Sequence, residues 1–311
     1  MAKAFVVGNV SLDLVLGGIP DYPEWGTEIL IPGYVMRPGG AASNAALALA
    51  ALGVPTFVVA TVGDDALGAD IRKQFAKASV QTDFLFHIPG YQTAISVGVT
   101  NARTKERSFL TDLGAQECLA KEHFESILPN LEDGDFILLC GYFLSPRLRG
   151  KVLAETLATL RKKCLLTILF DTGWPPEGWT TETRQEIQGL LSSFEYFLPN
   201  EKELEGVGGD TIFSLPRQGV IVKRGREGCT AYTKEGVFSV PTIDVPVTDT
   251  IGAGDYFNAG FIFGLACGYP LPMVLRCANL VASLNISLSA TRDRLVTKRE
   301  LENALFSEAQ V

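Results

Sequence analysis

The feature that most constrains the fold is a repeated alternation of two kinds of segment. Short apolar runs, most of them bounded by glycine or aspartate, occupy residues 4–8, 56–63, 136–141, 165–171, 196–200 and 220–225. Runs this short and this apolar are typical of strands buried on both faces of a parallel sheet. Helical patterns lie between them at 41–52, 67–78, 148–160 and 183–191. The alternation predicts a doubly wound α/β fold, with a mostly parallel sheet between helices and right-handed crossovers.

Two parts of the chain depart from this rhythm. After about Gly252 the pattern is only helical, at 255–267, at 272–288 and in a last helix that a capping box of Thr297 and Glu300 would begin. The stretches 10–38 and 92–112 instead show strand-like alternation without an intervening helix. We therefore expect a small accessory sheet, inserted as a lid into a single domain that covers 1–311.

The composition restricts the classes of partner. The 311 residues are 47% hydrophobic and carry a net charge of −8, so the chain can form a core but has no general attraction to nucleic acid or anionic membrane. The six cysteines are scattered, no secretory signal is recognisable, and no apolar run is long enough to span a bilayer. These features predict free thiols, a cytoplasmic location and small molecules as partners.

Residues 249–255, Asp-Thr-Ile-Gly-Ala-Gly-Asp, place two carboxylates around a flexible turn just before an apolar helical pattern. A helix start leaves several backbone N–H groups without intrahelical partners, and these groups bind anions readily. The sequence therefore predicts an anion cradle at Gly252, Ala253 and Gly254, suited to a transferred phosphoryl group. Asp255 would lie beside it as a base for an attacking hydroxyl. The structural alternative is a glycine turn that opens a buried helix, with Asp255 as a cap.

Two other segments offer groups that bind hydroxyls. Gly39 and Gly40 precede a strong helical pattern, so a ligand can approach their backbone closely, and the Asn44 amide supplies a donor and an acceptor. Asp13 follows the first predicted strand, at the carboxyl end where ligands bind in α/β sheets. A carboxylate there can accept two sugar hydroxyls. A tight turn at the glycines and a solvated turn at Asp13 explain the same residues.

Two further segments suggest nucleotide and metal binding. Asn200 and Glu203 follow a predicted strand, and Mg²⁺ needs only one or two such oxygens because it keeps several of its waters. Lys223, Gly225 and Gly228 end another predicted strand in a turn that suits ribose and phosphate. A helix cap and a hairpin are the respective alternatives. The sequence contains no Walker phosphate loop, no dinucleotide fingerprint after its first strand and no Gly-x-Ser-x-Gly elbow.

In order and spacing, these motifs resemble the ribokinase-like (PfkB) family of carbohydrate kinases over nearly the whole chain. The resemblance rests on Pro38-Gly-Gly with Asn44, on Val62-Gly-Asp-Asp with Gly68, on Asn200 with Glu203, and above all on 249–255. It implies a three-layer α/β/α core with a small β-sheet lid, and ATP-dependent transfer of the γ-phosphoryl group to a primary alcohol of a sugar or nucleoside. It matches Asp255 to the catalytic base, Gly252, Ala253 and Gly254 to the anion hole, and Asp13, Gly39, Gly40 and Asn44 to the sugar contacts.

The same resemblance implies the nucleotide and cation sites. Asn200 and Glu203 match the Mg²⁺ motif, and Lys223, Gly225 and Gly228 match the nucleotide loop. Asn279, Ala282 and Ile286, spaced as on one face of a helix, match the adenine wall. Thr248, Asp249 and Ile251 match a monovalent-cation site for K⁺, although Ser289-Ala290-Thr291 replaces the Gly-Ala of many relatives.

We therefore expect an ATP- and Mg²⁺-dependent kinase of a free sugar of the ribose, ketohexose or 2-keto-3-deoxygluconate type. Ala41 and Ala42 favour a free sugar, because sugar-phosphate kinases of the family tend to carry a lysine there. Arg107 is expected to contact the substrate from the lid, together with residues such as Trp25, Tyr34 and Phe109. A nucleoside kinase and a sugar-sensing module without activity remain the alternatives, and a homodimer through the lid is expected from the family.

Overall fold

The computed structural model describes residues 2–104, 107–247, 250–288 and 295–306. Within them, the central element is a nine-stranded sheet. At one edge β12 pairs antiparallel with both β11 and β13, and all the other neighbouring strands pair in parallel. From that edge across, its strands are β13 (Gly236–Val240), β12 (Cys229–Thr233), β11 (Gly219–Lys223), β10 (Tyr196–Phe197), β9 (Thr167–Asp171), β8 (Phe136–Cys140), β1 (Ala4–Gly8), β4 (Thr56–Gly63) and β5 (Gln81–Ile88).

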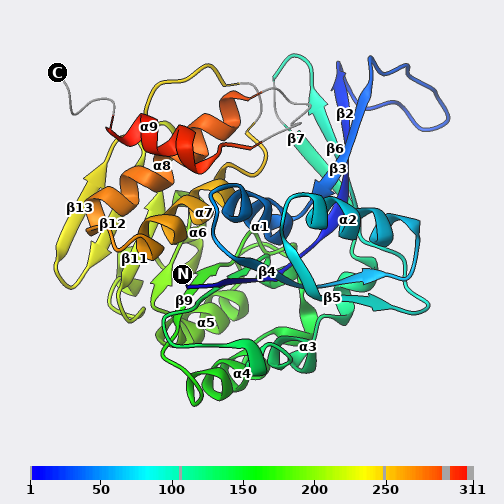
Figure 1. Cartoon of the computed structure of the whole chain (residues 1–311). Helices are drawn as coiled ribbons and strands as arrows, with labels where there is room; N and C mark the ends of the chain where they lie inside the picture. The colour runs from blue at the N-terminus through cyan, green and yellow to red at the C-terminus, as the bar shows by residue number, and fades with distance from the viewer. Residues whose placement is uncertain (1, 105–106, 248–249, 289–294, 307–311) are drawn as a thin grey trace.

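Helices cover both faces of this sheet (Figure 1). One face packs against α1 (Ala41–Ala51), α2 (Ala66–Lys77), α7 (Ala253–Ala266), α8 (Leu271–Ser287) and α9 (Lys298–Phe306). The other packs against α3 (Lys121–Glu125), α4 (Lys151–Arg161), α5 (Thr181–Leu190) and α6 (Glu201–Val207). Because side chains alternate along a strand, β1 sends Ala4 and Val6 into the first core and Phe5 and Val7 into the second. The predicted three-layer arrangement is confirmed.

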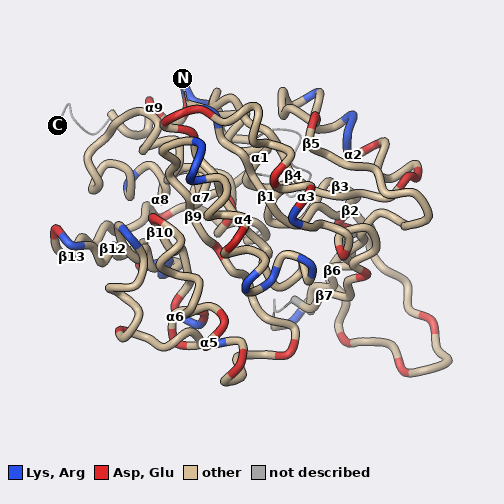
Figure 2. Tube along the Cα trace, turned by 90° about the horizontal axis from the view of Figure 1, so that it is seen from below, with Lys and Arg blue, Asp and Glu red and all other residues tan. Residues whose placement is uncertain are grey.

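A second, four-stranded sheet stands at one end of the first, at the upper right of Figure 1. Its strands are, in order, β3 (Tyr34–Gly39), β2 (Ser11–Ile19), β6 (Ile95–Asn101) and β7 (Arg107–Asp112). The two stretches that interrupt the sequence rhythm contribute two strands each, so the predicted small accessory sheet is confirmed. The segment between β2 and β3 protrudes from the rest of the molecule (Figures 1 and 2).

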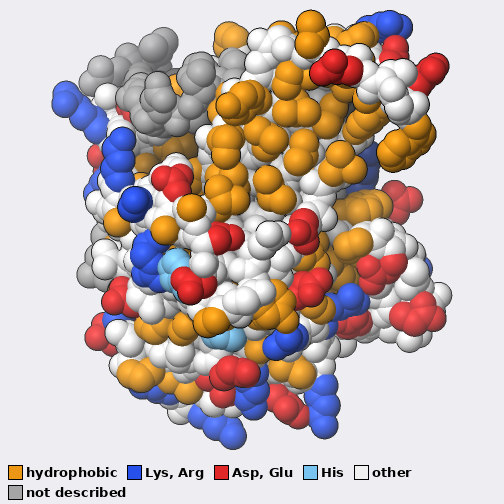
Figure 3. Space-filling view, turned by 90° about the vertical axis from the view of Figure 1, so that its right-hand side faces the viewer, with side chains coloured by type: hydrophobic (Ala, Val, Ile, Leu, Met, Phe, Trp, Pro, Cys, Tyr) orange, Lys and Arg blue, Asp and Glu red, His pale blue; other side chains and the backbone are white. Residues whose placement is uncertain are grey.

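The two faces of this small sheet differ in chemistry. Asp13, Ser96 and Thr111 form one row across the ladder, and all three line a cavity described below. The next row, which points to the opposite face because side chains alternate along a strand, is entirely apolar. It consists of Met36, Leu14, Val97 and Leu110. Figure 3, which views the molecule from this side, shows hydrophobic side chains gathered over the small sheet.

Two departures from the predicted boundaries bear on the site and on the edge of the sheet. The ladder of β10 ends at Phe197 instead of residue 200, and Asn200 makes only an isolated bridge to Lys223. Pro199, which has no N–H to donate, separates the two. Strand β5 was not predicted, because its first three residues, Gln-Thr-Asp, are polar and lie at the edge of the sheet. None of the helices in the described ranges is both long and apolar enough to cross a membrane.

Candidate active site

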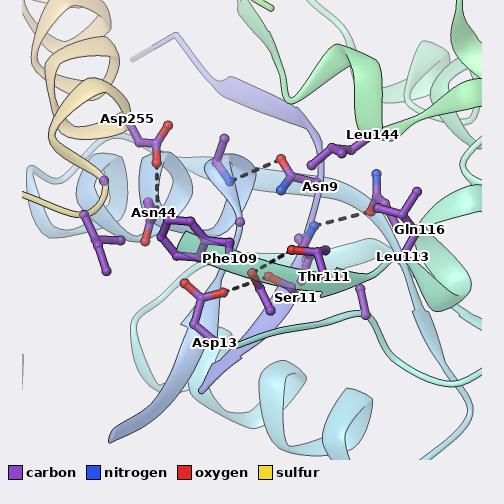
Figure 4. Close-up of a pocket in the computed structure, with 17 residues that line it drawn as sticks. Asn9, Ser11, Asp13, Asn44, Phe109, Thr111, Leu113, Gln116, Leu144 and Asp255 are labelled. Atoms are coloured by element: carbon purple, nitrogen blue, oxygen red, sulfur yellow. Dashed lines mark hydrogen bonds between the residues drawn. The ribbon is translucent and has the colours of Figure 1, made fainter. Parts of the chain in front are cut away.

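A cavity of about 190 Å³ lies between the small sheet and the first turns of α1 and α7 (Figure 4). Segments far apart in the chain line it, among them the loop after β1, the inner face of the small sheet and the residues just before α7. Asp13, Gly40, Asn44, Gly252 and Asp255 all take part. The structure thus brings part of the predicted acceptor set and part of the predicted catalytic set to one cavity, whereas Gly39, Ala253 and Gly254 do not line it.

A hydrogen bond joins these two groups directly. The Nδ2 atom of Asn44 in α1 donates to Oδ2 of Asp255 in α7 over 2.8 Å (Figure 4). Gly252, immediately before α7, has a φ of +79°, in the left-handed region that glycine tolerates. A Cβ atom there would lie only 3.1 Å from both Asn44 Nδ2 and the Tyr256 hydroxyl. Glycine at 252 therefore lets α7 begin close enough to α1 for the pair to form.

The surroundings of Asp255 change its acidity. Burial, followed by the charge of Asp171, raises the pKa of Asp255 from 3.8 to about 7, although the Asn44 hydrogen bond and the charge of Lys223 lower it. The charge of Asp13, across the cavity, is the smallest of the contributions that raise this pKa. A carboxyl group with a pKa near neutrality is matched to general-base catalysis at neutral pH.

The glycines before α1 have a packing role that differs from the one expected. A Cβ atom at Gly39 would lie 1.8 Å from Oδ1 of Asp13, so only glycine leaves room for that carboxylate. Gly40 has a φ of +87°, and a Cβ atom there would lie 2.4 Å from the carbonyl oxygen of Asn9. Both glycines thus allow a close approach of protein groups that flank the cavity. The Asp13 carboxylate is oriented by Ser11, whose hydroxyl donates to Oδ1 over 3.0 Å.

Several other lining residues carried no signal in the sequence. Gln116 is fully buried, accepts the N–H of Val10 over 3.3 Å and donates to the hydroxyl of Ser145 over 2.8 Å. Val10, Leu113 and Leu144 add an apolar wall. Only the fold brings these residues together with Asp13.

The lid residues singled out from the sequence separate into three groups. Phe109 lines the cavity, as Figure 4 shows, whereas Trp25 and Tyr34 are exposed and do not line it. Arg107 begins β7, but its side chain lies outside the described part of the structure.

The predicted Mg²⁺ residues form a helix cap. Asn200 and Glu203 make a reciprocal capping box at the start of α6, with Asn200 N donating to Glu203 Oε2 over 2.8 Å and Glu203 N donating to Asn200 Oδ1 over 2.9 Å. Glu203 is buried, and its burial and the nearby Asp171 raise its pKa. The described residues contain no cluster of three or more His, Cys, Asp or Glu side chains able to hold a metal. The expectation that Asn200 and Glu203 bind Mg²⁺ through water stays a prediction.

The predicted nucleotide loop and adenine wall meet at the end of β13. Gly225 and Gly228 follow β11 with φ values of +55° and +89°. A Cβ atom at Gly228 would lie 2.1 Å from the carbonyl oxygen of Val240, and Asn279 Nδ2 in α8 donates to that same oxygen over 2.9 Å. Ala282, one turn further, is half-buried and packs against the core. These residues do not line the cavity described above.

The predicted monovalent-cation site is only partly visible. Thr248 and Asp249 lie outside the described residues, as do Ser289, Ala290 and Thr291. Ile251 lines the cavity next to Gly252.

Lys223, which the sequence assigned to the nucleotide loop, is linked through Asp171 to α7. This link was not predicted from the sequence. The Nζ atom of Lys223 donates to Asp171 Oδ2 over 2.7 Å, and Asn258 Nδ2 donates to the same oxygen over 2.6 Å. Asp171 was visible only as the last residue of an apolar run, and Asn258 only as part of a helical pattern. Their partners are distant in sequence, so no local pattern could have identified them.

Comparisons with known proteins agree with this geometry. The model of the pfkB family carbohydrate kinases matches residues 1–298. A ribokinase from Bacillus subtilis is 26% identical over 98% of this chain and 100% of its own length. A 5-dehydro-2-deoxygluconokinase from Bacillus anthracis is 25% identical over 85% of this chain and 84% of its own. A candidate ribokinase II from E. coli, solved in complex with ATP and Mg²⁺, superposes with a TM-score of 0.84 at 20% identity, covering 99% of this chain and 100% of that one. The chain therefore belongs to the pfkB family of carbohydrate kinases, which are phosphotransferases with an alcohol acceptor.

Proposed function

We propose that this protein transfers the γ-phosphoryl group of ATP to a primary hydroxyl of a free sugar, with Asp255 as the general base. The observation that carries the proposal is the contact between Asn44 and Asp255 in a cavity that also contains Asp13. In this proposal a base, an amide and a second carboxylate surround one acceptor molecule.

In this proposal each group has a separate task. Asp13 accepts hydrogen bonds from two hydroxyls of the sugar and fixes its orientation. Asn44 holds the Asp255 carboxylate, which takes the proton of the attacking hydroxyl. The start of α7 at Gly252, Ala253 and Gly254 receives the oxygens of the transferred group. The small sheet, whose inner face carries Asp13, acts as a lid that excludes water from the reaction.

The size and lining of the cavity favour a free monosaccharide as acceptor. Its volume of about 190 Å³ is below the roughly 300–1,000 Å³ of pockets for drug-sized ligands. The apolar wall of Val10, Leu113 and Leu144 favours one second candidate, a nucleoside, whose base would lie against it. The names of the relatives indicate different acceptors, ribose in one case and 5-dehydro-2-deoxygluconate in another. The choice between ribose, a ketohexose, a sugar acid and a nucleoside therefore rests on measurement.

ATP and Mg²⁺ are proposed as the phosphoryl donor and its metal. The E. coli neighbour binds both, and here Lys223, Gly225, Gly228 and Asn279 would contact the nucleotide. Asn200 and Glu203 would hold waters of the metal, whose contribution when bound is to neutralise charge on the phosphates. Activation by K⁺ near Ile251 and a cytoplasmic location stay predictions.

A homodimer through the lid is also proposed. Tyr34, Met36 and Leu110 on the outer face of the small sheet are 64%, 51% and 61% exposed, which is unusual for large apolar side chains on one face. A second copy with the same face would cover them in an isologous contact.

The proposal is tested by a screen that couples ADP release to a spectroscopic signal, with pentoses, ketohexoses, sugar acids and nucleosides as acceptors, each with K⁺ or Na⁺. Turnover with a free sugar that Asp255→Asn abolishes supports it. Faster turnover with adenosine or inosine would transfer the function to nucleosides. ADP release that no acceptor stimulates, combined with measurable sugar binding, would instead indicate a sensing module.

A further inference from the structure

We propose that Asp171 is a positioning residue for phosphoryl transfer, because with Asn258 it holds the Lys223 ammonium group against the first turn of α7, where the transferred phosphoryl oxygens would lie. The inference rests on the proposed function and adds two residues, Asp171 and Asn258, to its machinery.

The first support is the geometry of the ion pair. Asp171 ends β9 and Lys223 ends β11, so their side chains meet over the carboxyl end of the intervening β10. The Nζ–Oδ2 distance is 2.7 Å, and the two side chains are only 12% and 9% exposed. A buried charge-assisted hydrogen bond of this length fixes the lysine head group, which on the surface would be mobile.

The second support is that the same carboxylate is attached to α7. Oδ2 of Asp171 also accepts a hydrogen bond of 2.6 Å from Nδ2 of the fully buried Asn258. Asn258 follows Asp255 by three positions, so the two side chains lie on the same side of the helix. Asp171 thereby links the position of Lys223 to the helix that carries the base.

The third support is where the ammonium group lies. A Cβ atom built on Gly254 would be 3.4 Å from Lys223 Nζ, so the cation lies beside the last residue of the Gly-Ala-Gly turn. The positive end of the helix dipole is at this same end, which disfavours a cation. The carboxylates of Asp171, Asp255 and Glu203 offset this cost in the described structure, and the terminal phosphate of ATP would add a further anion.

Charge coupling gives the arrangement a measurable signature. The charged groups that act on Asp255 are Asp171 and Asp13, which raise its pKa, and Lys223, which lowers it. Removal of the negative charge at 171 and removal of the positive charge at 223 should therefore move the acid limb of the pH–rate profile in opposite directions. A purely structural pair would not do so.

The test compares Asp171→Asn, Lys223→Met and the double variant with the wild type, using the acceptor found in the screen. We expect Asp171→Asn to lower kcat by about tenfold or more while the KM of the acceptor stays within about twofold. Lys223→Met should lower kcat by about 10²-fold. It should also weaken calorimetric binding of ATP about tenfold more than binding of ADP, since the lysine lies at the terminal phosphate. The double variant should lose little more than Lys223→Met alone, because Asp171 acts through Lys223.

The pH–rate profiles decide the mechanism. The acid limb should move to lower pH in Asp171→Asn and to higher pH in Lys223→Met. The matched control is Asp135→Asn, which removes another buried aspartate that pairs with a lysine, Lys3, at 3.6 Å and away from the cavity. This control should lower the melting temperature without shifting the acid limb of the pH–rate profile.

Two results would overturn the inference. One is an Asp171→Asn enzyme whose kcat stays within about twofold of the wild type. The other is a variant that loses stability as the Asp135 control does but keeps the acid limb in place. Both results require wild-type turnover, so they are distinct from a failure of the proposed function, in which the wild type itself shows none.

Discussion

Replacement of Asp255 by Asn should inactivate the enzyme and stabilise its fold. The half-buried carboxylate has a pKa of about 7 against an ordinary value of 3.8, so above pH 7 the folded state holds a charge that its surroundings disfavour. Asparagine has almost the same shape and retains an oxygen for the hydrogen bond from Asn44. The variant therefore removes the charge while it leaves the contact.

The size of the stabilisation follows from this pKa difference. A rise of roughly three units, at about 1.4 kcal/mol per unit, makes the ionised carboxylate cost about 4 kcal/mol of unfolding free energy. The sign is that of an acid with a raised pKa: the wild type binds more protons folded than unfolded, so it loses stability as pH rises from 3.8 to about 7. Compared with the wild type, Asp255→Asn should gain about 4 kcal/mol at pH 8 and about 2 kcal/mol at pH 5.

Urea unfolding at both pH values, without nucleotide or acceptor, measures these differences. The control is Asp65→Asn, because Asp65 caps α2 by accepting from Gly68 N over 2.8 Å and also binds Thr93 N over 2.7 Å. Burial raises the pKa of Asp65, but hydrogen bonds from Thr93 and Gly68 outweigh this effect and hold the pKa below its ordinary value of 3.8. The carboxylate is therefore ionised at both pH 5 and pH 8, so Asp65→Asn should lose the same stability at both. The reasoning is refuted if Asp255→Asn shows no gain, or the same gain at both pH values. In the same variant kcat should fall by about 10²–10⁴-fold, with sugar binding retained.

Three further predictions concern the acid limb, the turn before α7 and the lid. In the wild type, kcat/KM should fall tenfold per pH unit below about pH 7, because the free enzyme must have Asp255 deprotonated; a profile flat down to pH 5 would contradict this. Gly252→Ala should reduce kcat strongly, because its Cβ would press on Asn44. The control is Gly53→Ala, since Gly53 has the same φ of +79° but no atom within 4 Å of an added Cβ. This control should cost about 1 kcal/mol of stability and leave kcat unchanged. Leu110→Glu should shift the sedimentation coefficient toward that of a monomer. The control Val237→Glu, at a position 64% exposed on β13, should leave the sedimentation coefficient unchanged. Equal behaviour of the two variants would argue against pairing through the lid.

The sequence predicted those parts of the fold that depend on local pattern. The buried strands β1 and β4 read as continuous apolar runs, and both were placed at their observed bounds. The edge strand β5 was missed because its first three residues are polar. Lateral order also was not predictable, since β1 lies between β4 and β8 only through contacts remote in the chain.

The site was predictable where its chemistry is concentrated in a motif. Asp255 and Gly252 belong to one segment, and their common cavity with Asp13 and Asn44 could be anticipated from the family resemblance. Asp171 could not, because its partners lie 52 and 87 positions further along the chain. A buried polar network of this kind leaves no periodic trace in a single sequence.

The bond between Asn44 and Asp255 joins positions 211 residues apart, and α1 and α7 pack together around it. During synthesis, β1 and α1 leave the ribosome long before the segment that completes their surroundings. A polypeptide that stops short of residue 253 would retain most of the large sheet, yet α1 would lack its packing partner α7 and the chain would lack Asp255. Premature termination at any point before α7 should therefore yield an inactive product that chaperones and proteases recognise.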